Sequence, residues 1–214
     1  ELRKILEHRT QELIEYQNLS YAKEYMSFVG NIFEKEQKTR SSSELSQNVA
    51  KYLFKLMATK DEYEVARLSL KAELDSAINK EFGKSAKISY MLHPPFLKAM
   101  ENIPILNMLP GVKSKLALGS WFKVFYVMLK NMKFLRGTPF DFMAWFSNDV
   151  RKADRKALNH YKSILSNNID EIGNGKYQDL KEFSILPDII RGYEEVRLET
   201  MDEFYLKSNN LFKS

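Results

Sequence analysis

The chain has 214 residues, of which 44% are hydrophobic and 29% charged, a composition that excludes wholesale disorder and allows a sizeable core. It has no cysteine, which excludes disulfides, thiolate metal sites, iron–sulfur ligation of the usual type and a cysteine nucleophile. The net charge is +5, and residues 101–140 carry six basic side chains against one acidic side chain. The longest run without a charged residue, 102–112, is about half a membrane span, so we expect no membrane partner.

Apolar residues recur at helical spacing from the start of the chain. Over residues 1–38 this spacing predicts one long helix or two helices in succession. Ser41 and Glu44 have the spacing of a capping box, which predicts the start of the next helix. A charged cluster at residues 60–64 interrupts that helical pattern, which then continues to Gly83, the expected C-cap.

Residues 84–112 differ from the rest because they contain four prolines, which predict an irregular segment. Within it, Ile88, Tyr90 and Leu92 alternate with other residues and indicate one short extended stretch. Residues 114–134 return to helical spacing, and the turn at 136–139 ends the predicted helix.

Two further helices are predicted in the last third of the chain. One spans roughly 147–168 and is followed by a polar loop at 167–176, and the other begins near Pro187 and runs toward Asn209. The pattern predicts a mainly helical, all-α fold with an irregular segment at 84–112. We expect residues 1–214 to form a single helical domain, a piece of a larger multidomain protein.

The densest charged cluster runs from Lys60 to Arg67. On a helix, Lys60 and Glu64 are four residues apart and Glu64 and Arg67 are three apart, so both pairs are within ion-pair reach. Asp61, Glu64 and Arg67 share one face and are candidates for a polar network between helices. Paired carboxylates also perform acid–base chemistry, but no nucleophile or metal-binding set accompanies them, which favours a structural role.

A second group of candidates lies before the turn at 136–139. Lys130, Lys133 and Arg136 are candidates to hold an anionic group, either an acidic protein surface or a phosphate. The simpler interpretation is a solvated helix face, with Arg136 at a helix C-terminus where the dipole favours its charge. No nucleic-acid-binding motif accompanies these residues, so we expect no nucleic acid partner.

Three arginines near predicted helix ends, Arg151, Arg155 and Arg191, are candidates for docking contacts, with structural salt bridges as the alternative. His93 precedes two prolines and is either a ligand or general base or, more simply, a turn residue. His8 and His160 lie far from it in the sequence. We therefore predict no metal site and no catalytic residue in this chain.

Several segments, in order along the chain, resemble the C-terminal helical domain of indolepyruvate ferredoxin oxidoreductases, members of the 2-oxoacid:ferredoxin oxidoreductase family. They are Lys55–Leu68 (KLMATKDEYEVARL), His93–Pro95, Leu135–Asp141 (LRGTPFD), Arg151–Tyr161 with the pattern RxxDR…Y, and Leu186–Tyr193 (LPDIIRGY). The first and third segments are long and specific, and the similarity covers most of the chain.

The resemblance implies a cytoplasmic parent enzyme that oxidatively decarboxylates aryl 2-oxoacids to acyl-coenzyme A. It implies thiamine diphosphate, Mg²⁺ and iron–sulfur clusters as the cofactors of that enzyme, coenzyme A as a substrate and ferredoxin as the electron acceptor. The thiamine diphosphate signature, GDG followed by NN, does not occur in this chain. The resemblance therefore implies a non-catalytic accessory domain whose partners are the catalytic domains, with a homo-oligomer as a further candidate assembly.

A function from another class stays open at this point. The alternative is a free-standing helical adaptor that binds an acidic partner or a phosphate ligand through the basic residues 113–136. A third interpretation is an enzyme in its own right. The observation that discriminates them is whether the reading frame continues upstream of Glu1 into a domain with the GDG…NN signature.

Overall fold

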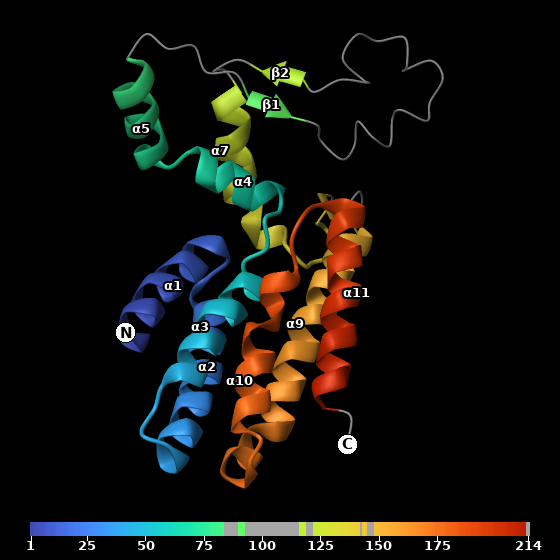
Figure 1. Cartoon of the computed structure of the whole chain (residues 1–214). Coiled ribbons are helices and arrows are strands. Elements are labelled where there is room, and N and C mark those ends of the chain that lie inside the picture. The colour runs from blue at the N-terminus through green and yellow to red at the C-terminus, as the bar shows by residue number, and fades with distance from the viewer. Residues whose placement is uncertain (84–89, 93–115, 119–121, 142, 145–147, 213–214) are drawn as a thin grey trace. The chain divides into compact units, whose positions relative to one another are not determined.

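The computed structural model describes residues 1–83, 90–92, 116–118, 122–141, 143–144 and 148–212. The described elements are helices apart from one pair of short strands, so the predicted all-α fold is confirmed (Figure 1). The elements in chain order are α1 (Leu2–Tyr16), α2 (Leu19–Thr39), α3 (Glu44–Met57), α4 (Glu62–Ser69), α5 (Ala72–Phe82), β1 (Tyr90–Leu92), β2 (Leu116–Leu118), α7 (Lys123–Asn131), η3 (Met132–Leu135), α9 (Asn148–Asn168), η4 (Ile169–Asn174), α10 (Tyr177–Ile185), η5 (Leu186–Ile189) and α11 (Glu194–Leu211). Among the described residues, no helix combines the length and the apolar character that crossing a membrane requires.

Residue contacts divide the chain into two compact units. The first unit comprises Glu1–Thr59 and Asp149–Ser214, and the second unit comprises Lys60–Asn148. In the sequence, the second unit is thus inserted between the two halves of the first, where the helical pattern alone predicts one domain.

The first unit is a helical bundle with one shared hydrophobic core. Helices from both halves of the sequence supply fully buried side chains, among them Leu13, Tyr25, Val29, Leu53, Tyr161, Leu165, Phe183 and Phe204. Two of the buried tyrosines also need a hydrogen-bond partner. The Tyr25 hydroxyl donates to the Ala50 carbonyl, and the Tyr161 hydroxyl donates to the Ser184 carbonyl, each at 2.8 Å. These bonds connect α2 to α3 and α9 to α10.

The predicted helices at residues 1–38 are two, α1 and α2. Asn18 begins α2, because its side-chain oxygen accepts a hydrogen bond from the Tyr21 backbone N–H at 2.9 Å. The predicted capping box of Ser41 with Glu44 at the start of the next helix is wrong. The helix α3 begins at Glu44, and its N-cap residue is Ser43.

The side chain that caps α3 comes from α2. The Glu36 carboxylate is fully buried and accepts hydrogen bonds from the Leu45 and Ser46 backbone N–H groups at 3.0 and 2.9 Å. It also accepts bonds from the Ser46 hydroxyl and from the Tyr177 hydroxyl of α10. A negative charge at a helix N-terminus is favoured by the dipole, so one carboxylate joins three helices.

In the second unit, α4 packs against α7. Their core consists of Tyr63, Ala66, Phe122, Tyr126, Leu129 and Met143. Lys123 of α7 donates to both carboxylate oxygens of Asp75 in α5 at 2.9 Å. The predicted C-cap of α5 is confirmed at Gly83, whose φ of 81° favours glycine.

The predicted helix at 114–134 is wrong in its first part. Leu116–Leu118 forms the strand β2, which pairs antiparallel with β1 so that Tyr90 lies opposite Leu118. Residues 119–121 lie outside the described residues, and the helix α7 begins at Lys123. Cross-strand pairing is a tertiary effect that overrides helical spacing. The strand β1 confirms part of the predicted extended stretch, while the rest of 84–112 lies outside the described residues.

The C-terminal helices also differ from the prediction. The helix α10 was not predicted, although Leu180 and Phe183 have helical spacing and are buried. The last helix begins at Glu194 and not near Pro187, because Pro187 lies in the short 3₁₀ helix η5. Gly192 separates the two with a φ of 81°, and a Cβ added there would lie 2.7 Å from Val196 Cγ1.

Candidate functional site

The charged residues that the sequence singles out at the start of α4 meet the turn that follows η3. Asp61 caps α4, since its Oδ1 accepts a hydrogen bond from the Glu64 backbone N–H at 2.9 Å. Arg136 binds the same carboxylate twice, with Nε 2.5 Å from Oδ2 and Nη2 2.8 Å from Oδ1. The Asp61 and Arg136 side chains are 6% and 12% exposed. A planar guanidinium matches a carboxylate in this geometry, so the pair fixes the start of α4 to the end of η3.

A second bidentate pair lies within α4. Arg67 donates from Nε to Glu64 Oε2 at 2.9 Å and from Nη2 to Glu64 Oε1 at 2.8 Å. This is the predicted pair at a spacing of three residues, and the Arg67 side chain is 5% exposed. Asp61 at the N-cap of α4 and Glu64 in its first turn are thus each held by a largely buried arginine.

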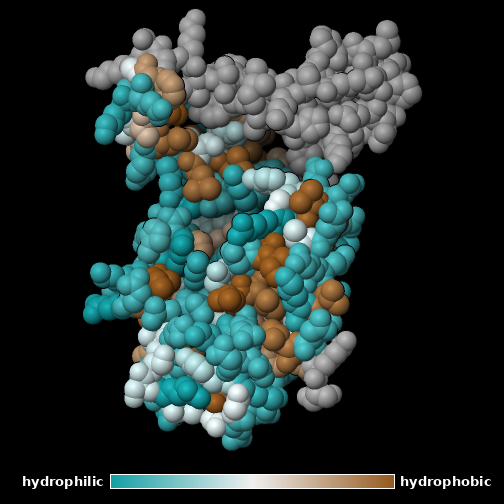
Figure 2. All heavy atoms as spheres, viewed as in Figure 1, coloured by the Kyte–Doolittle hydropathy of each residue, from teal (hydrophilic) through white to brown (hydrophobic). Residues whose placement is uncertain are grey.

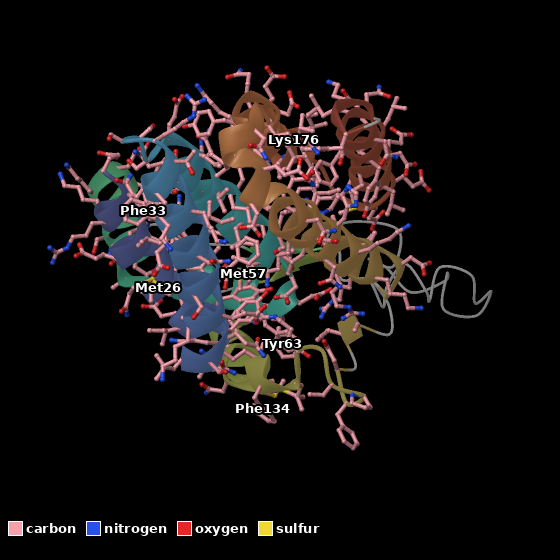
Figure 3. All side chains as sticks on the ribbon, turned by 90° about the horizontal axis from the view of Figure 1, so that it is seen from below. Met26, Phe33, Met57, Tyr63, Phe134 and Lys176 are labelled. Atoms are coloured by element: carbon pink, nitrogen blue, oxygen red, sulfur yellow. The ribbon has the colours of Figure 1, made fainter. Side chains whose placement is uncertain are left out.

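Asp141 connects α4 to the same turn from its other side. Its Oδ1 accepts a hydrogen bond from the Tyr63 hydroxyl at 2.9 Å, and its Oδ2 accepts one from the Gly137 backbone N–H at 3.1 Å. Tyr63, which is labelled in Figure 3, is 1% exposed. Its ring lies 5.5 Å from the Arg136 guanidinium. Gly137 has a φ of 77°, a conformation that glycine adopts without strain. We call this set the polar network: Asp61, Tyr63, Glu64, Arg67, Arg136 and Asp141.

The carboxylates of the polar network are all bound within it. Both oxygens of Asp61, Glu64 and Asp141 accept hydrogen bonds from donors of the same unit. A general acid or base must instead reach a proton of its substrate. Removing one partner of a buried ion pair leaves a buried charge without compensation, at a cost of about 3–5 kcal/mol. The geometry therefore favours the structural interpretation of these residues.

The candidate lysines that neighbour these residues in the sequence lie at the edge of the polar network. Lys60 is exposed and precedes the cap of α4, so the helical spacing predicted for Lys60 and Glu64 does not apply. Lys130 is exposed and Lys133 is half-buried. The predicted anion clamp of Lys130, Lys133 and Arg136 would have to compete with Asp61, which already holds the Arg136 guanidinium.

In the first unit, the structure brings Arg191 to Lys55. Lys55 Nζ donates to the Asp188 carbonyl at 3.0 Å, and Arg191 donates from Nη2 to the Asp188 carboxylate at 2.6 Å. Burial lowers the pKa of Lys55 by more than the nearby Asp188 charge raises it. The hydrogen bond from Arg191 lowers the pKa of Asp188. Because Arg191 is 70% exposed, this cluster is a surface contact between α3 and η5.

Arg151 is half-buried and Arg155 is exposed on α9. The ion pair in this region joins Asp154 to Arg197 of α11, whose Nε and Nη2 donate to Asp154 Oδ1 at 2.8 and 2.7 Å. The sequence prediction missed Arg197, because only the packing of α9 with α11 brings it to Asp154. No local pattern signals that contact.

Histidines offer no catalytic arrangement in the described part of the chain. His93 lies outside the described residues. His160 Nε2 is 2.8 Å from the Ser208 hydroxyl, and its ring packs edge-on against Phe183, Phe204 and Tyr205. Burial and the Lys156 charge lower the pKa of His160. Within the same described residues, no group of three or more acidic or histidine side chains could hold a metal ion.

A groove of about 710 Å³ lies between α1 and α2 in the first unit. Its apolar lining consists of Leu2, Leu6, Ile14, Met26, Val29 and Phe33. Met26 and Phe33 both belong to α2 (Figure 3). At the rim, Arg3 pairs with Glu7 at 2.8 Å. None of the residues singled out from the sequence lines this groove, so it is separate from the polar network.

Comparison with known proteins gives one match. The model of a family of unknown function, DUF6537, matches residues 2–209, almost the whole chain. No curated protein and no solved structure matches the sequence or the fold.

Proposed function

Because the chain belongs to DUF6537, a family of unknown function, we propose its function from its own residues. The proposal is a non-catalytic accessory domain of an indolepyruvate (2-oxoacid):ferredoxin oxidoreductase. In it, the catalytic domains of a cytoplasmic parent enzyme are the direct partners of this chain. Ferredoxin accepts electrons from that parent enzyme, and coenzyme A is one of its substrates.

The observation that carries the proposal is the polar network. It joins the two most specific segments that resemble the oxidoreductase domain, Lys55–Leu68 and Leu135–Asp141, through Asp61 with Arg136 and Tyr63 with Asp141. Motif residues that performed chemistry would face a cleft with open hydrogen-bonding sites. These side chains bond one another, as expected of residues that keep a domain rigid for docking.

The residues of this chain do not fit the cofactors of the implied enzyme. Iron–sulfur clusters need thiolate ligands, and the chain has no cysteine. The carboxylates of the polar network have their oxygens bound by arginine, tyrosine and backbone donors, so they are poor candidates for Mg²⁺ ligands. Thiamine diphosphate, Mg²⁺ and the clusters would therefore belong to the catalytic domains, and no reaction step is assigned to this chain.

An activity assay of the parent enzyme with and without this domain tests the proposal. Indolepyruvate, thiamine diphosphate, Mg²⁺, coenzyme A and an electron acceptor are supplied to the chain alone, to the catalytic polypeptide alone, and to both together. We expect no turnover by the chain alone and higher activity or stability of the catalytic polypeptide when the chain is present. Turnover by the pure chain, or a catalytic polypeptide indifferent to it, would overturn the proposal.

The adaptor alternative is favoured by one observation, the basic character of residues 122–136, which contain four basic and no acidic side chains. Titration of coenzyme A into the chain and into Arg136→Ala, at low and high salt, tests its phosphate form. Attraction between exposed charges is screened over about 8–10 Å at physiological ionic strength, so a phosphate clamp would weaken with salt. Since Asp61 holds Arg136, we expect no binding by either protein.

A further inference from the structure

The helix α7 is apolar on opposite sides. One side packs into the core of the second unit through Tyr126 and Leu129. On the other side Val124, Val127 and Met128 are 76%, 48% and 47% exposed. A helix at a protein surface normally carries polar residues on the side away from its core. The exposed side of α7 therefore resembles a surface that another molecule covers.

The exposed apolar residues continue beyond the helix end. Phe134 in η3 is 68% exposed and projects from the ribbon (Figure 3). Figure 2 shows hydrophobic side chains at the surface where α4, α5 and α7 lie. We call Val124, Val127, Met128 and Phe134 the α7 stripe. Exposed apolar residues that are contiguous, unlike single scattered ones, mark interaction sites.

The charged side chains that the segment 122–136 itself supplies beside the α7 stripe are all basic. Of the four basic residues at 122–136, Lys123 pairs with Asp75 and Arg136 pairs with Asp61. Lys130 is exposed, and none of the ion pairs among the described residues includes it. A partner face complementary to this stripe is apolar at its centre and carries acidic residues at its rim.

We infer that the α7 stripe docks on an apolar, acidic-rimmed protein face. This inference rests on the proposed function, and the partner is accordingly the catalytic polypeptide that bears the GDG…NN signature. A lipid surface fits less well, because helices that lie in a membrane interface carry several basic residues on a polar face. The side of α7 opposite the stripe is instead the core of the unit, and Lys130 is the one basic residue of α7 exposed among its described side chains.

A labelling experiment can locate the docking surface because the chain has no cysteine of its own. Val127→Cys places one thiol in the α7 stripe, and Leu206→Cys on α11 is the control, since Leu206 is 61% exposed. The rate of reaction with a maleimide is measured by mass spectrometry, with and without the catalytic polypeptide. We expect that polypeptide to slow labelling of Val127→Cys about tenfold or more and to leave Leu206→Cys unchanged.

A second experiment introduces charged residues into the α7 stripe and measures binding to the catalytic polypeptide. The double variant Val124→Asp with Val127→Asp puts two charges against the apolar centre of the partner face, inside its acidic rim, and Leu206→Asp is its matched control. We expect the double variant to bind the catalytic polypeptide about tenfold or more weakly, and the control to bind as the unchanged chain does. Circular dichroism and the melting temperature verify that both variants fold.

The outcomes separate this inference from the proposed function. If the chain binds the catalytic polypeptide and the double variant binds equally well, the α7 stripe is not the docking surface, while the proposed function stands. If the unchanged chain does not bind at all, both are overturned.

Slow labelling of Val127→Cys in the isolated chain would mean that the chain itself or a second copy covers the stripe, which overturns the inference. Sedimentation would then tell these two occupants apart. Binding to phosphatidylserine vesicles that the double variant loses would also overturn it, in favour of a membrane.

Discussion

Arg67 and Arg3 each pair with a glutamate on their own helix, but they differ in burial. The Arg67 side chain is 5% exposed, whereas the Arg3 side chain is 90% exposed. We expect Arg67→Ala to lower the free energy of unfolding by about 3–5 kcal/mol, because Glu64 is left buried without its partner. Arg3→Ala should cost less than about 1 kcal/mol. Urea unfolding measures both.

A double variant tests whether the Arg67 effect arises from the stranded charge. Replacing Glu64 and Arg67 together with Leu and Met removes both charges, and we expect it to recover much of the stability lost in Arg67→Ala. Equal losses in Arg67→Ala and Arg3→Ala would contradict the structural role of the polar network.

His160 predicts a dependence of stability on pH. Its pKa is lowered by burial, and by the Lys156 charge, so the folded chain binds its proton less readily than the unfolded chain does. The stability that neutral, buried His160 contributes is fully present above its pKa in the unfolded chain, about 6.5. It is lost as the pH falls through the lower pKa of the folded chain. We expect the melting temperature to fall between about pH 7 and pH 5, and less so in His160→Gln. His8→Gln is the control, and an identical fall in the two variants would contradict the assignment.

At the scale of elements, the start of α3 depends on a carboxylate from another helix. Glu36→Ala would leave the buried Leu45 and Ser46 N–H groups without an acceptor. We expect it to lower the free energy of unfolding by about 3 kcal/mol, since each unsatisfied buried group costs about 1–3 kcal/mol. Ser41→Ala should change it by less than about 0.5 kcal/mol, as an ordinary surface substitution does. Thermal and urea unfolding measure the stability of both variants, and a large loss in Ser41→Ala would support the capping box of Ser41 with Glu44 instead.

The elements that the sequence predicts well are those whose signals are local. Gly83 marks a helix end by its backbone chemistry, and α5 ends there as predicted. The capping of α3 by Glu36 and the pairing of β1 with β2 were not predictable in the same way, because each depends on residues brought together by folding. The helix α10 is a different case, since Leu180 and Phe183 have helical spacing but the prediction assigns no element between the polar loop at 167–176 and Pro187.

In the candidate site, too, contacts between residues close in the sequence are predictable and contacts between distant residues are not. The pairing of Glu64 with Arg67 follows from a spacing of three residues and is confirmed. The partners of Asp61 and Asp154 lie 75 and 43 residues away in the sequence. Arg136 is a candidate from the sequence, but its pairing with Asp61, like the pairing of Arg197 with Asp154, depends on tertiary packing.

At the scale of the whole molecule, the first unit needs both of its sequence halves. Glu36 bonds Tyr177, Lys55 bonds Asp188, and the core takes residues from both sides of the insertion. We expect residues 1–59 and 149–214, expressed as separate peptides, to be largely unfolded alone and to form a helical complex when mixed. Circular dichroism of the mixture against the sum of its parts measures this. Full helicity of residues 1–59 by themselves would contradict the shared core.

The insertion also sets the order of events on the ribosome. The apolar faces of α1, α2 and α3 are complete once residue 59 has emerged, but α10, which packs against α3 and shares its core, is made only after residue 176. At synthesis rates of about 5–20 residues per second, the wait is on the order of ten seconds. During that time the nascent first half exposes the hydrophobic surface that chaperones bind. The second unit, whose residues are contiguous, can fold within the same interval.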